Sequence, residues 1–585
     1  MKNNKLRAIL AILLVLVMLS GCGAVGISQE RDEEDMEYAS PDPSVFAGDV
    51  NELESAEISQ ERDEENCVKF SDMEYARPDP SVFAGDVNEL ESALADGSKF
   101  EEITELLDTC YADYYDFSTM YALAQIHYFS DLSNEDYQEE YSYCTQASAE
   151  IQQTVEQMYV DCANSDIAQE LEEEYFWEGF AEEYGEGYES SYTDRAVELM
   201  QQESELLSDY YELQSEMQDA LEEPNAYALI VYDDYSVPFT EIYISLVKVR
   251  RAMAEEMGYE SYAEMCYENY ERDYTPEQAE QYAQDVKEYI VPLCSEANEA
   301  CSLWYYEMDE DRLVNALSAV TKSMGGEIDK AFEFMQHYEL YDVAVSDDKA
   351  ELSFTTYLDS YDSPYIMINP YGDTDDILTF AHEFGHFTDA YVNYNSIESL
   401  DLSEVFSQSM EYLAMERFDG VLYDDEAEMV KAIKLLSTLD TYQYQAAYAE
   451  FERRVYELSD EDLQTWKIRK IFSDVSLEYD CCDEDKADYY GTLWYQVTHF
   501  FESPFYVISY AVSVDASLQI YALEKENAGA GLDMYNNLLE NRGSELIDSL
   551  ESVGLQSPFA EGRVQAAAEL LSAELNEITA AGIAA

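Results

Sequence analysis

Hydrophobic residues recur every three or four positions along most of this chain, which is the spacing of amphipathic helices. The pattern predicts long helices through residues 96–235, including segments near Tyr137–Val160 and Ala196–Ala220. A stripe that contains Leu246 and Met253 predicts a further helix. Because proline is scarce and strand-like alternation is rare, we expect a mainly α-helical fold.

Capping residues mark the ends of several helices. Thr275 followed by Pro276 is typical of a helix start, because threonine caps the first N–H groups and proline fits the first helical position. Gly258 predicts the end of the preceding helix. The acidic run from Asp373 to Asp376 would supply the cap and first-turn charges of another helix.

The N-terminus carries a targeting signal. Three basic residues precede an apolar run, Ala8–Leu19, which is shorter than the roughly 20 residues that span a bilayer. The run ends in Leu-Ser-Gly-Cys, which looks like a bacterial lipobox that is cut before Cys22. We expect residues 1–21 to be a signal peptide and a lipid on Cys22 to anchor the protein outside the cytoplasm at the cell membrane. An ordinary secretory signal is the alternative.

An acidic duplication follows the signal. Ile27–Glu34 recurs as Ile58–Glu65, and Met36–Ala56 recurs almost unchanged as Met73–Ala93. We expect residues 22–94 to form a stalk or linker that holds the protein away from the membrane. A recent tandem duplication without a function of its own is the alternative interpretation.

Charge limits the partners of the protein. The formal net charge is −98, so the phosphates of nucleic acids would be repelled and we expect no nucleic-acid partner. The same charge disfavours docking on anionic lipid without the acyl anchor. Hydrophobic residues make up 47 % of the chain, which is enough for a packed core.

The candidate chemistry centres on histidine, of which the chain has only five. The H-E-x-x-H pattern from His382 to His386 places two imidazoles on one face of a helix, where both reach a single zinc ion. Glu383 lies beside them and could accept a proton from a metal-bound water as a general base. The pattern therefore predicts a zinc peptidase site.

Two alternating segments, Leu352–Leu358 and Tyr365–Asn369, precede this pattern and predict a pair of β-strands. They form either a simple structural hairpin or an edge that pairs with the backbone of a substrate, as in many zinc peptidases.

A catalytic zinc ion needs a third protein ligand. Glu404 and Glu411 lie seven residues apart on a predicted helix and therefore share a face. One could bind zinc while the other hydrogen-bonds a liganding histidine, and their spacing alone does not separate the two roles.

A third histidine opens a segment rich in aromatic residues. His499, Tyr506 and Tyr510 are candidates to donate hydrogen bonds to the oxyanion that forms during peptide hydrolysis. The alternative for each tyrosine is packing in the hydrophobic core.

These segments together resemble the oligoendopeptidase F and thimet oligopeptidase family of zinc metallopeptidases. The similarity covers about residues 95–575 and is carried by Tyr365–Asn369, Asp376–His386, Asp401–Gln408, His499 and Phe505–Ala511. The resemblance implies that Glu404 is the third zinc ligand and that Glu411 supports a ligand from behind. It also implies catalytic roles for His499, Tyr506 and Tyr510.

The resemblance further implies a two-lobed helical ellipsoid with a deep central channel and a small β-sheet near the zinc helix. We expect an N-terminal helical region at 95–235 and a catalytic region at 236–585. The expected function is a monomeric endopeptidase with one zinc ion that hydrolyses short unstructured peptides outside the cytoplasm. The alternative is a surface lipoprotein that binds peptides without cutting them, although such a binder has no need of Glu383.

Overall fold

The computed structural model describes residues 66–581 except 178, 186–187, 189–192, 223–226, 301–302, 351 and 395–398. The expected signal peptide, the lipidation site Cys22 and the first copy of the duplication lie outside the described residues. Within the described part, no helix combines the length and the apolar character needed to cross a bilayer.

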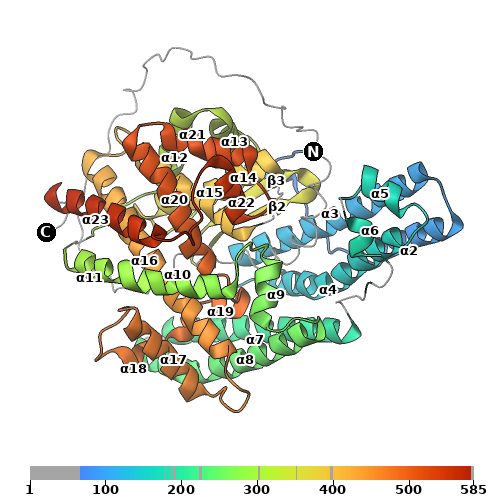
Figure 1. Cartoon of the computed structure of the whole chain (residues 1–585), viewed down its shortest axis with the longest axis horizontal. Coiled ribbons are helices and arrows are strands. Elements are labelled where there is room, and N and C mark those ends of the chain that lie inside the picture. The colour runs from blue at the N-terminus through green and yellow to red at the C-terminus, as the bar shows by residue number, and fades with distance from the viewer. Residues whose placement is uncertain are drawn as a thin grey trace.

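The second copy of the duplication belongs to the fold, which corrects the expected stalk boundary at residue 94. After a 3₁₀ turn at Phe70–Asp72, helix α2 packs its buried Phe83, Val87 and Leu90 against the next helices. These N-terminal helices extend to one side of the molecule (Figure 1). They are α2 (Pro80–Asp96), α3 (Phe100–Ser130), α4 (Glu135–Ala163), α5 (Ala168–Glu174) and α6 (Phe180–Glu183).

Helix α8 runs through the expected boundary between residues 235 and 236 and remains continuous at Pro238. Thr275 caps α10 with a full capping box, as its sequence predicts. The central helices are α7 (Asp194–Glu222), α8 (Ala228–Glu256), α9 (Tyr262–Asn269), α10 (Pro276–Tyr289), α11 (Val291–Ala300), α12 (Glu310–Met324) and α13 (Gly326–His337).

The two predicted strands form a small sheet with a third, shorter strand. Strand β3 (Ser363–Ile368) lies in the middle, antiparallel to β2 (Ser353–Leu358) and parallel to β1 (Tyr341–Asp342). A 3₁₀ turn at Asp359–Tyr361 joins β2 to β3. All residues of β2 and β3 are buried, and β2 forms one edge of the sheet.

The rest of the described chain is helical. Its elements are α14 (Asp376–Asn393), α15 (Leu400–Met415), α16 (Asp424–Tyr456), α17 (Thr465–Glu478), α18 (Ala487–Tyr490), η3 (Trp494–Gln496), α19 (His499–Glu502), α20 (Ile508–Glu526), α21 (Ala530–Asn541), α22 (Leu546–Val553) and α23 (Arg563–Ala581). The mainly helical fold with a small sheet beside α14 is thus confirmed.

Two hydrophobic cores underlie this architecture. The larger core joins the N-terminal helices, the sheet and helices α14–α16 and α20, whereas the smaller one lies among α7, α8, α17 and the end of α16. Residues 499–510 connect them, because Phe500 and Phe501 pack in the smaller core while Tyr506 and Tyr510 pack in the larger. Figure 1 shows α19 between α16 above and α7 below.

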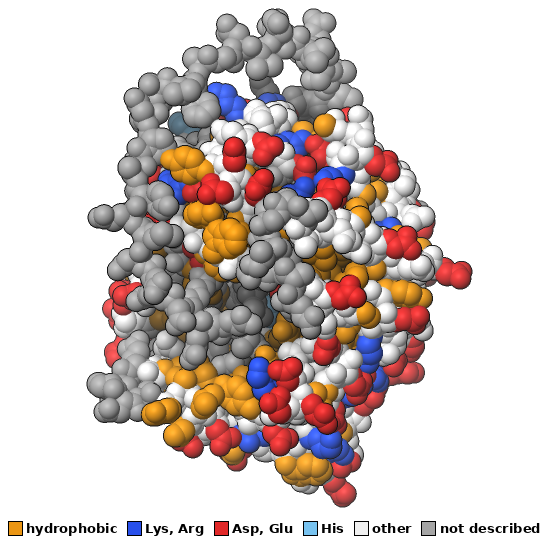
Figure 2. Space-filling model, turned by 90° about the vertical axis from the view of Figure 1, so that its left-hand side faces the viewer, with side chains coloured by type: hydrophobic (Ala, Val, Ile, Leu, Met, Phe, Trp, Pro, Cys, Tyr) orange, Lys and Arg blue, Asp and Glu red, His pale blue; other side chains and the backbone are white. Residues whose placement is uncertain are grey.

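The surface reflects the composition. On the part of the face that Figure 2 draws in colour, acidic side chains are scattered among hydrophobic ones, and no continuous basic area is seen. This distribution agrees with the formal charge of −98.

Candidate metal centre

Helices α14 and α15 pack unusually closely at Gly385, the residue before His386. A Cβ atom on Gly385 would lie 2.5 Å from the Cα atom of Ser407 and 2.7 Å from the carbonyl oxygen of Phe406. Such distances are shorter than any normal contact, so only glycine permits this approach. The close packing brings Glu404 on α15 to the histidines on α14.

The start of α14 is held differently from the sequence-based expectation. Asp375 occupies the cap position without a capping hydrogen bond. Instead, the carboxylate of Asp376 accepts hydrogen bonds from the N–H groups of residues 371–373 in the preceding loop. The acidic run therefore fixes the loop onto the helix rather than capping its first turn.

The side chains of His382, His386 and Glu404 converge on one point. Oε2 of Glu404 lies 3.4 Å from Nε2 of His382 and 3.8 Å from Nε2 of His386, and the three ligand atoms all lie within 4.8 Å of one another. Tetrahedral zinc with bonds of about 2.0–2.2 Å separates its ligand atoms by roughly 3.3–3.6 Å. Both Nε2 atoms are buried and have no hydrogen-bond partner among the described residues. The group therefore fits a zinc ion.

Hydrogen bonds from behind orient all three side chains. Nδ1 of His382 lies 3.0 Å from Glu411 Oε1, and Nδ1 of His386 lies 2.9 Å from Ser403 Oγ. These contacts direct both Nε2 atoms toward Glu404. Ser407 donates a hydrogen bond of 2.9 Å to Oε2 of Glu404. The geometry thus separates the two acids that the sequence left open, because Glu404 belongs to the group that could hold a metal and Glu411 lies behind His382.

Charge also favours a cation at this point. Glu411 accepts a 2.7 Å hydrogen bond from the buried Lys434. Burial alone would raise the pKa of Glu411, but the charges of Lys434 and His382 hold it below its usual value. Burial alone would lower the pKa of His382, yet its hydrogen bond to Glu411 and the charge of Glu404 raise it to about 9. The acidic surroundings thus attract positive charge.

Glu383 lies between the metal group and the sheet. Its carboxylate is fully buried, and Oε2 accepts a 2.7 Å hydrogen bond from Thr355 on β2. Oε1 has no hydrogen-bond partner among the described residues. Burial raises the pKa of Glu383 to about 7, against the opposing charge of His382. A carboxyl group with such a pKa is suited to general-base work near neutral pH, and a bound cation would lower its pKa.

The aromatic segment reaches the same place. Tyr506 donates a 2.7 Å hydrogen bond to Oε1 of Glu404, so its hydroxyl contacts a ligand side chain. The hydroxyl of Tyr510 lies 3.2 Å from Nε2 of His499, and the rings of His499 and Tyr506 stack with centroids 6.0 Å apart. The two tyrosines are therefore placed differently: Tyr506 at the ligand and Tyr510 at the histidine.

Sequence reasoning missed three polar residues of this site. Ser403 and Lys434 support the histidines, and Thr355 supports Glu383. Thr355 lies in a predicted strand and Ser403 adjoins Glu404, so their positions in the sequence could have identified them as candidates for the site. Nothing in the local sequence connects Lys434 to the site, because α16 meets α15 only in the folded protein.

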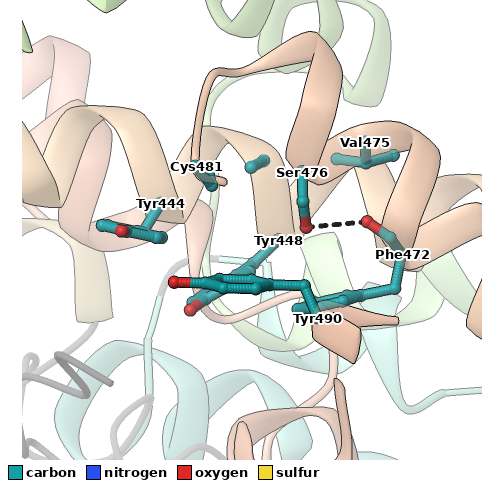
Figure 3. A pocket seen from close by; sticks show the side chains of 8 residues that line it. Tyr444, Tyr448, Phe472, Val475, Ser476, Cys481 and Tyr490 are labelled. Atoms are coloured by element: carbon teal, nitrogen blue, oxygen red, sulfur yellow. Dashed lines mark hydrogen bonds between the residues drawn. The ribbon is translucent and has the colours of Figure 1, made fainter. Parts of the chain in front are cut away.

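A separate small cavity lies away from these residues. Figure 3 shows its lining, which includes Tyr444, Tyr448, Phe472 and Tyr490 from α16, α17 and α18. Its volume of about 10 Å³ leaves room for about one water molecule, so the cavity is too small for a substrate. None of the candidate site residues lines it.

Comparison with protein families agrees with the geometry. The Peptidase M3 N-terminal domain matches residues 70–182, and Peptidase family M3 matches residues 330–569, which contain the whole metal group. The chain belongs to peptidase family M3. The first M3 match begins at residue 70, which agrees with the packing of α2 into the fold.

Individual M3 relatives show the same similarity over shorter stretches. An oligoendopeptidase F homolog of Borreliella burgdorferi is 28 % identical over 216 residues, which are 33 % of this chain and 34 % of the relative. Oligopeptidase PepF of Bacillus subtilis is 25 % identical over 229 residues, which are 37 % of this chain and 33 % of the relative. The alignments thus span about a third of the length of these relatives.

A solved structure shows that the M3 fold extends much further. PZ peptidase A, solved with an inhibitor, matches 87 % of this chain and 99 % of its own with a TM-score of 0.76. Its sequence identity is 23 %, so this likeness shows the fold alone.

Proposed function

We propose that this protein is a zinc-dependent endopeptidase that hydrolyses short unstructured peptides. The observation that carries the proposal is the convergence of His382, His386 and Glu404 beside the buried carboxylate of Glu383. Membership of peptidase family M3 supports the same reaction class.

The residues of the proposed site have separate roles in hydrolysis. His382, His386 and Glu404 would hold one zinc ion, which when bound supplies Lewis acidity for activating water and polarising a carbonyl group. Glu383 accepts the proton of the attacking water and later delivers it to the leaving amine. Thr355 holds Oε2 of Glu383, which leaves Oε1 available for the proton.

The edge of the sheet offers a place for the substrate backbone. Among the described strands, β2 pairs only with β3, and Thr355 places this edge strand against Glu383. An extended peptide could add to such an edge through main-chain hydrogen bonds, so that its scissile bond lies near the base.

His499 and Tyr510 form the second polar group of the proposed site. They lie within hydrogen-bond distance of each other. The ring of His499 stacks on that of Tyr506, whose hydroxyl donates a hydrogen bond to Glu404. A hydroxyl or imidazole donor aimed at the oxyanion of a peptide-hydrolysis transition state contributes about 3 kcal/mol. We assign this role to Tyr510 and His499, whereas Tyr506 orients Glu404.

The proposed location rests on the N-terminal sequence. The charged start, the short apolar run and Cys22 support a lipid-anchored protein outside the cytoplasm. The proposed form is a monomer with peptides as its partners.

A length series of fluorogenic peptides tests this function. The chain lacking residues 1–22 is compared with its Glu383→Gln variant, which keeps the size of the side chain and removes the base. Cleavage of short peptides by the first protein and not by the variant supports the proposal. Peptide binding by both proteins without cleavage by either would favour the non-catalytic binding lipoprotein.

A further inference from the structure

Phe505, the residue before Tyr506, adopts a left-handed backbone conformation with a φ of +64°. This region is sterically unfavourable for a bulky side chain, and residues remain there only when their surroundings impose it. The conformation directs the chain into Tyr506, whose hydroxyl contacts Glu404. What holds Phe505 in place therefore affects the metal centre.

Two buried side chains, one acidic and one basic, hold both polar groups of Phe505. Its N–H donates a 2.9 Å hydrogen bond to Oε1 of Glu452, and its carbonyl oxygen accepts a 3.0 Å hydrogen bond from Nη2 of Arg272. The same Nη2 donates to Oγ of Ser509 at 2.7 Å. The side chains of Arg272 and Glu452 are both fully buried. Neither polar side chain is needed for a hydrophobic core, and burying each carries a desolvation cost.

Arg272 also contacts the helix that carries the metal ligand. Its Nε lies 3.4 Å from Oδ2 of the buried Asp401, three residues before Glu404 on α15. The contacts therefore form a closed ring: Arg272 joins Asp401 to Phe505, and Tyr506 returns from Phe505 to Glu404. A ring of this kind fixes the distance between the aromatic segment and the ligand helix.

We propose that Arg272 and Glu452 are positioning residues that hold Phe505 left-handed and so set the hydroxyl of Tyr506 against Glu404. The inference deepens the proposed function, on which it rests. Neither residue touches substrate or metal; both act through Tyr506.

A buried ion pair can also serve stability alone, because removing one partner leaves an uncompensated charge. The test therefore needs a readout that general destabilisation does not produce. Coupling between Arg272 and Tyr506 in a double-mutant cycle supplies it, because substitutions that act through one contact are not additive.

The experiment measures kcat, KM and the Kd for zinc in Arg272→Met, Tyr506→Phe and the double variant, with unfolding curves to confirm folding. Displacing a site group by about 1 Å can cost about 100-fold in rate, so we expect Arg272→Met to lower kcat by about 10- to 100-fold with little change in KM. In the Tyr506→Phe background the same substitution should lower kcat by less than about threefold. Zinc affinity should show the same coupling.

Arg563→Met is the matched control. Arg563 forms another nearly buried ion pair, with Nε 2.8 Å from Oδ2 of Asp515, and within the described part of the chain no hydrogen bond or ion pair joins it to residues 499–506. Its effects should add to those of Tyr506→Phe. If Arg272→Met lowered kcat by the same factor in the wild-type and the Tyr506→Phe proteins, as is expected of the control, the proposal would be overturned.

Glu452 gives a second, independent test. Glu452→Gln keeps an acceptor for the N–H of Phe505 and should retain kcat, whereas Glu452→Leu should lower it. Equal kcat values in these two variants would contradict the role of Glu452. If the unmodified protein cleaves no peptide, the proposed function fails, while coupling in zinc affinity still decides the positioning role.

Discussion

The metal group and the aromatic segment meet at Glu404, but they are held in different ways. The three ligands come from α14 and α15, two adjacent helices in the larger core that touch at Gly385. The segment from His499 to Tyr510 passes between two cores and is held by side chains far away in the sequence. Arg250 on α8, for example, donates to the carbonyl oxygen of Phe500 at 3.2 Å and is fully buried.

The metal group and the aromatic segment should therefore respond differently to substitutions. The proposed ligands depend mainly on local helix packing, so distant substitutions that do not act through Tyr506 should leave zinc in place. The aromatic segment depends on contacts from α8, from the loop before α10 and from α16, so distant substitutions should alter turnover first.

The largest effect should come from Gly385→Ala. The new methyl group would meet backbone atoms of α15 that have no room to move, so the helices must separate and Glu404 must leave the histidines. We expect zinc affinity and turnover to fall by about 100-fold or more, since both depend on ligand geometry. Zinc titration by calorimetry measures the affinity.

Gly85→Ala in α2 is the control for this prediction, because a Cβ there meets nothing within 4 Å. It should leave zinc binding unchanged and stabilise its helix by up to about 1 kcal/mol. Unchanged zinc affinity in Gly385→Ala would contradict the close-packing argument.

Tyr510→Phe should affect turnover without affecting the metal. The variant removes one hydroxyl beside His499 and leaves the ligands untouched. Loss of a single oxyanion donor lowers kcat by about 10²–10³-fold, with KM and zinc affinity nearly constant. Steady-state kinetics measures the split, and an unaltered kcat would rule out this role for Tyr510.

Unlike Tyr510→Phe, the Glu411→Gln substitution should lower zinc affinity first. The substitution weakens the hydrogen bond that orients His382 and leaves Lys434 without its carboxylate partner. Loss of such an outer contact typically lowers metal affinity by about 10- to 100-fold. Competition with a chelator measures the change. Full zinc affinity would show that Glu411 does not support the ligand.

The smallest effect on the metal and on turnover is expected from Glu502→Gln on α19, which should instead change stability in a pH-dependent way. Burial raises the pKa of Glu502 to about 7, against hydrogen bonds from Tyr211 and Thr498. The folded protein therefore keeps this proton where the unfolded chain releases it, and the wild type loses stability as the pH rises from about 4.5 to 7.

Urea unfolding at several pH values tests this prediction. The variant should be more stable than the wild type by up to about 3 kcal/mol at pH 8, and the two should agree near pH 4. A pH-independent difference would contradict the assignment.

The sequence predicted the half of the site that depends on local spacing. His382, Glu383 and His386 share one helix turn, and helix periodicity placed Glu404 and Glu411 on one face. The expected strands and the capping at Thr275 also agree with the structure, since each depends on neighbouring residues. Spacing could not separate the roles of Glu404 and Glu411, because these depend on how α15 crosses α14.

The other half depends on tertiary contacts that no local pattern encodes. Lys434, Arg272 and Glu452 reach the site from elements far away in the chain. The expected end of the stalk at residue 94 differs from the structure for a similar reason. The acidic composition of residues 73–93 suggested a linker, but the burial of three apolar side chains on α2 decides in favour of a packed helix.

A crystal structure of the zinc-loaded protein with anomalous diffraction at the zinc edge tests most directly whether His382, His386 and Glu404 bind the metal. The account predicts one strong peak, bonded by Nε2 of His382, Nε2 of His386 and the carboxylate of Glu404, with Glu411 hydrogen-bonded to His382. A peak bonded by Glu411, or a principal peak away from α14 and α15, would contradict it.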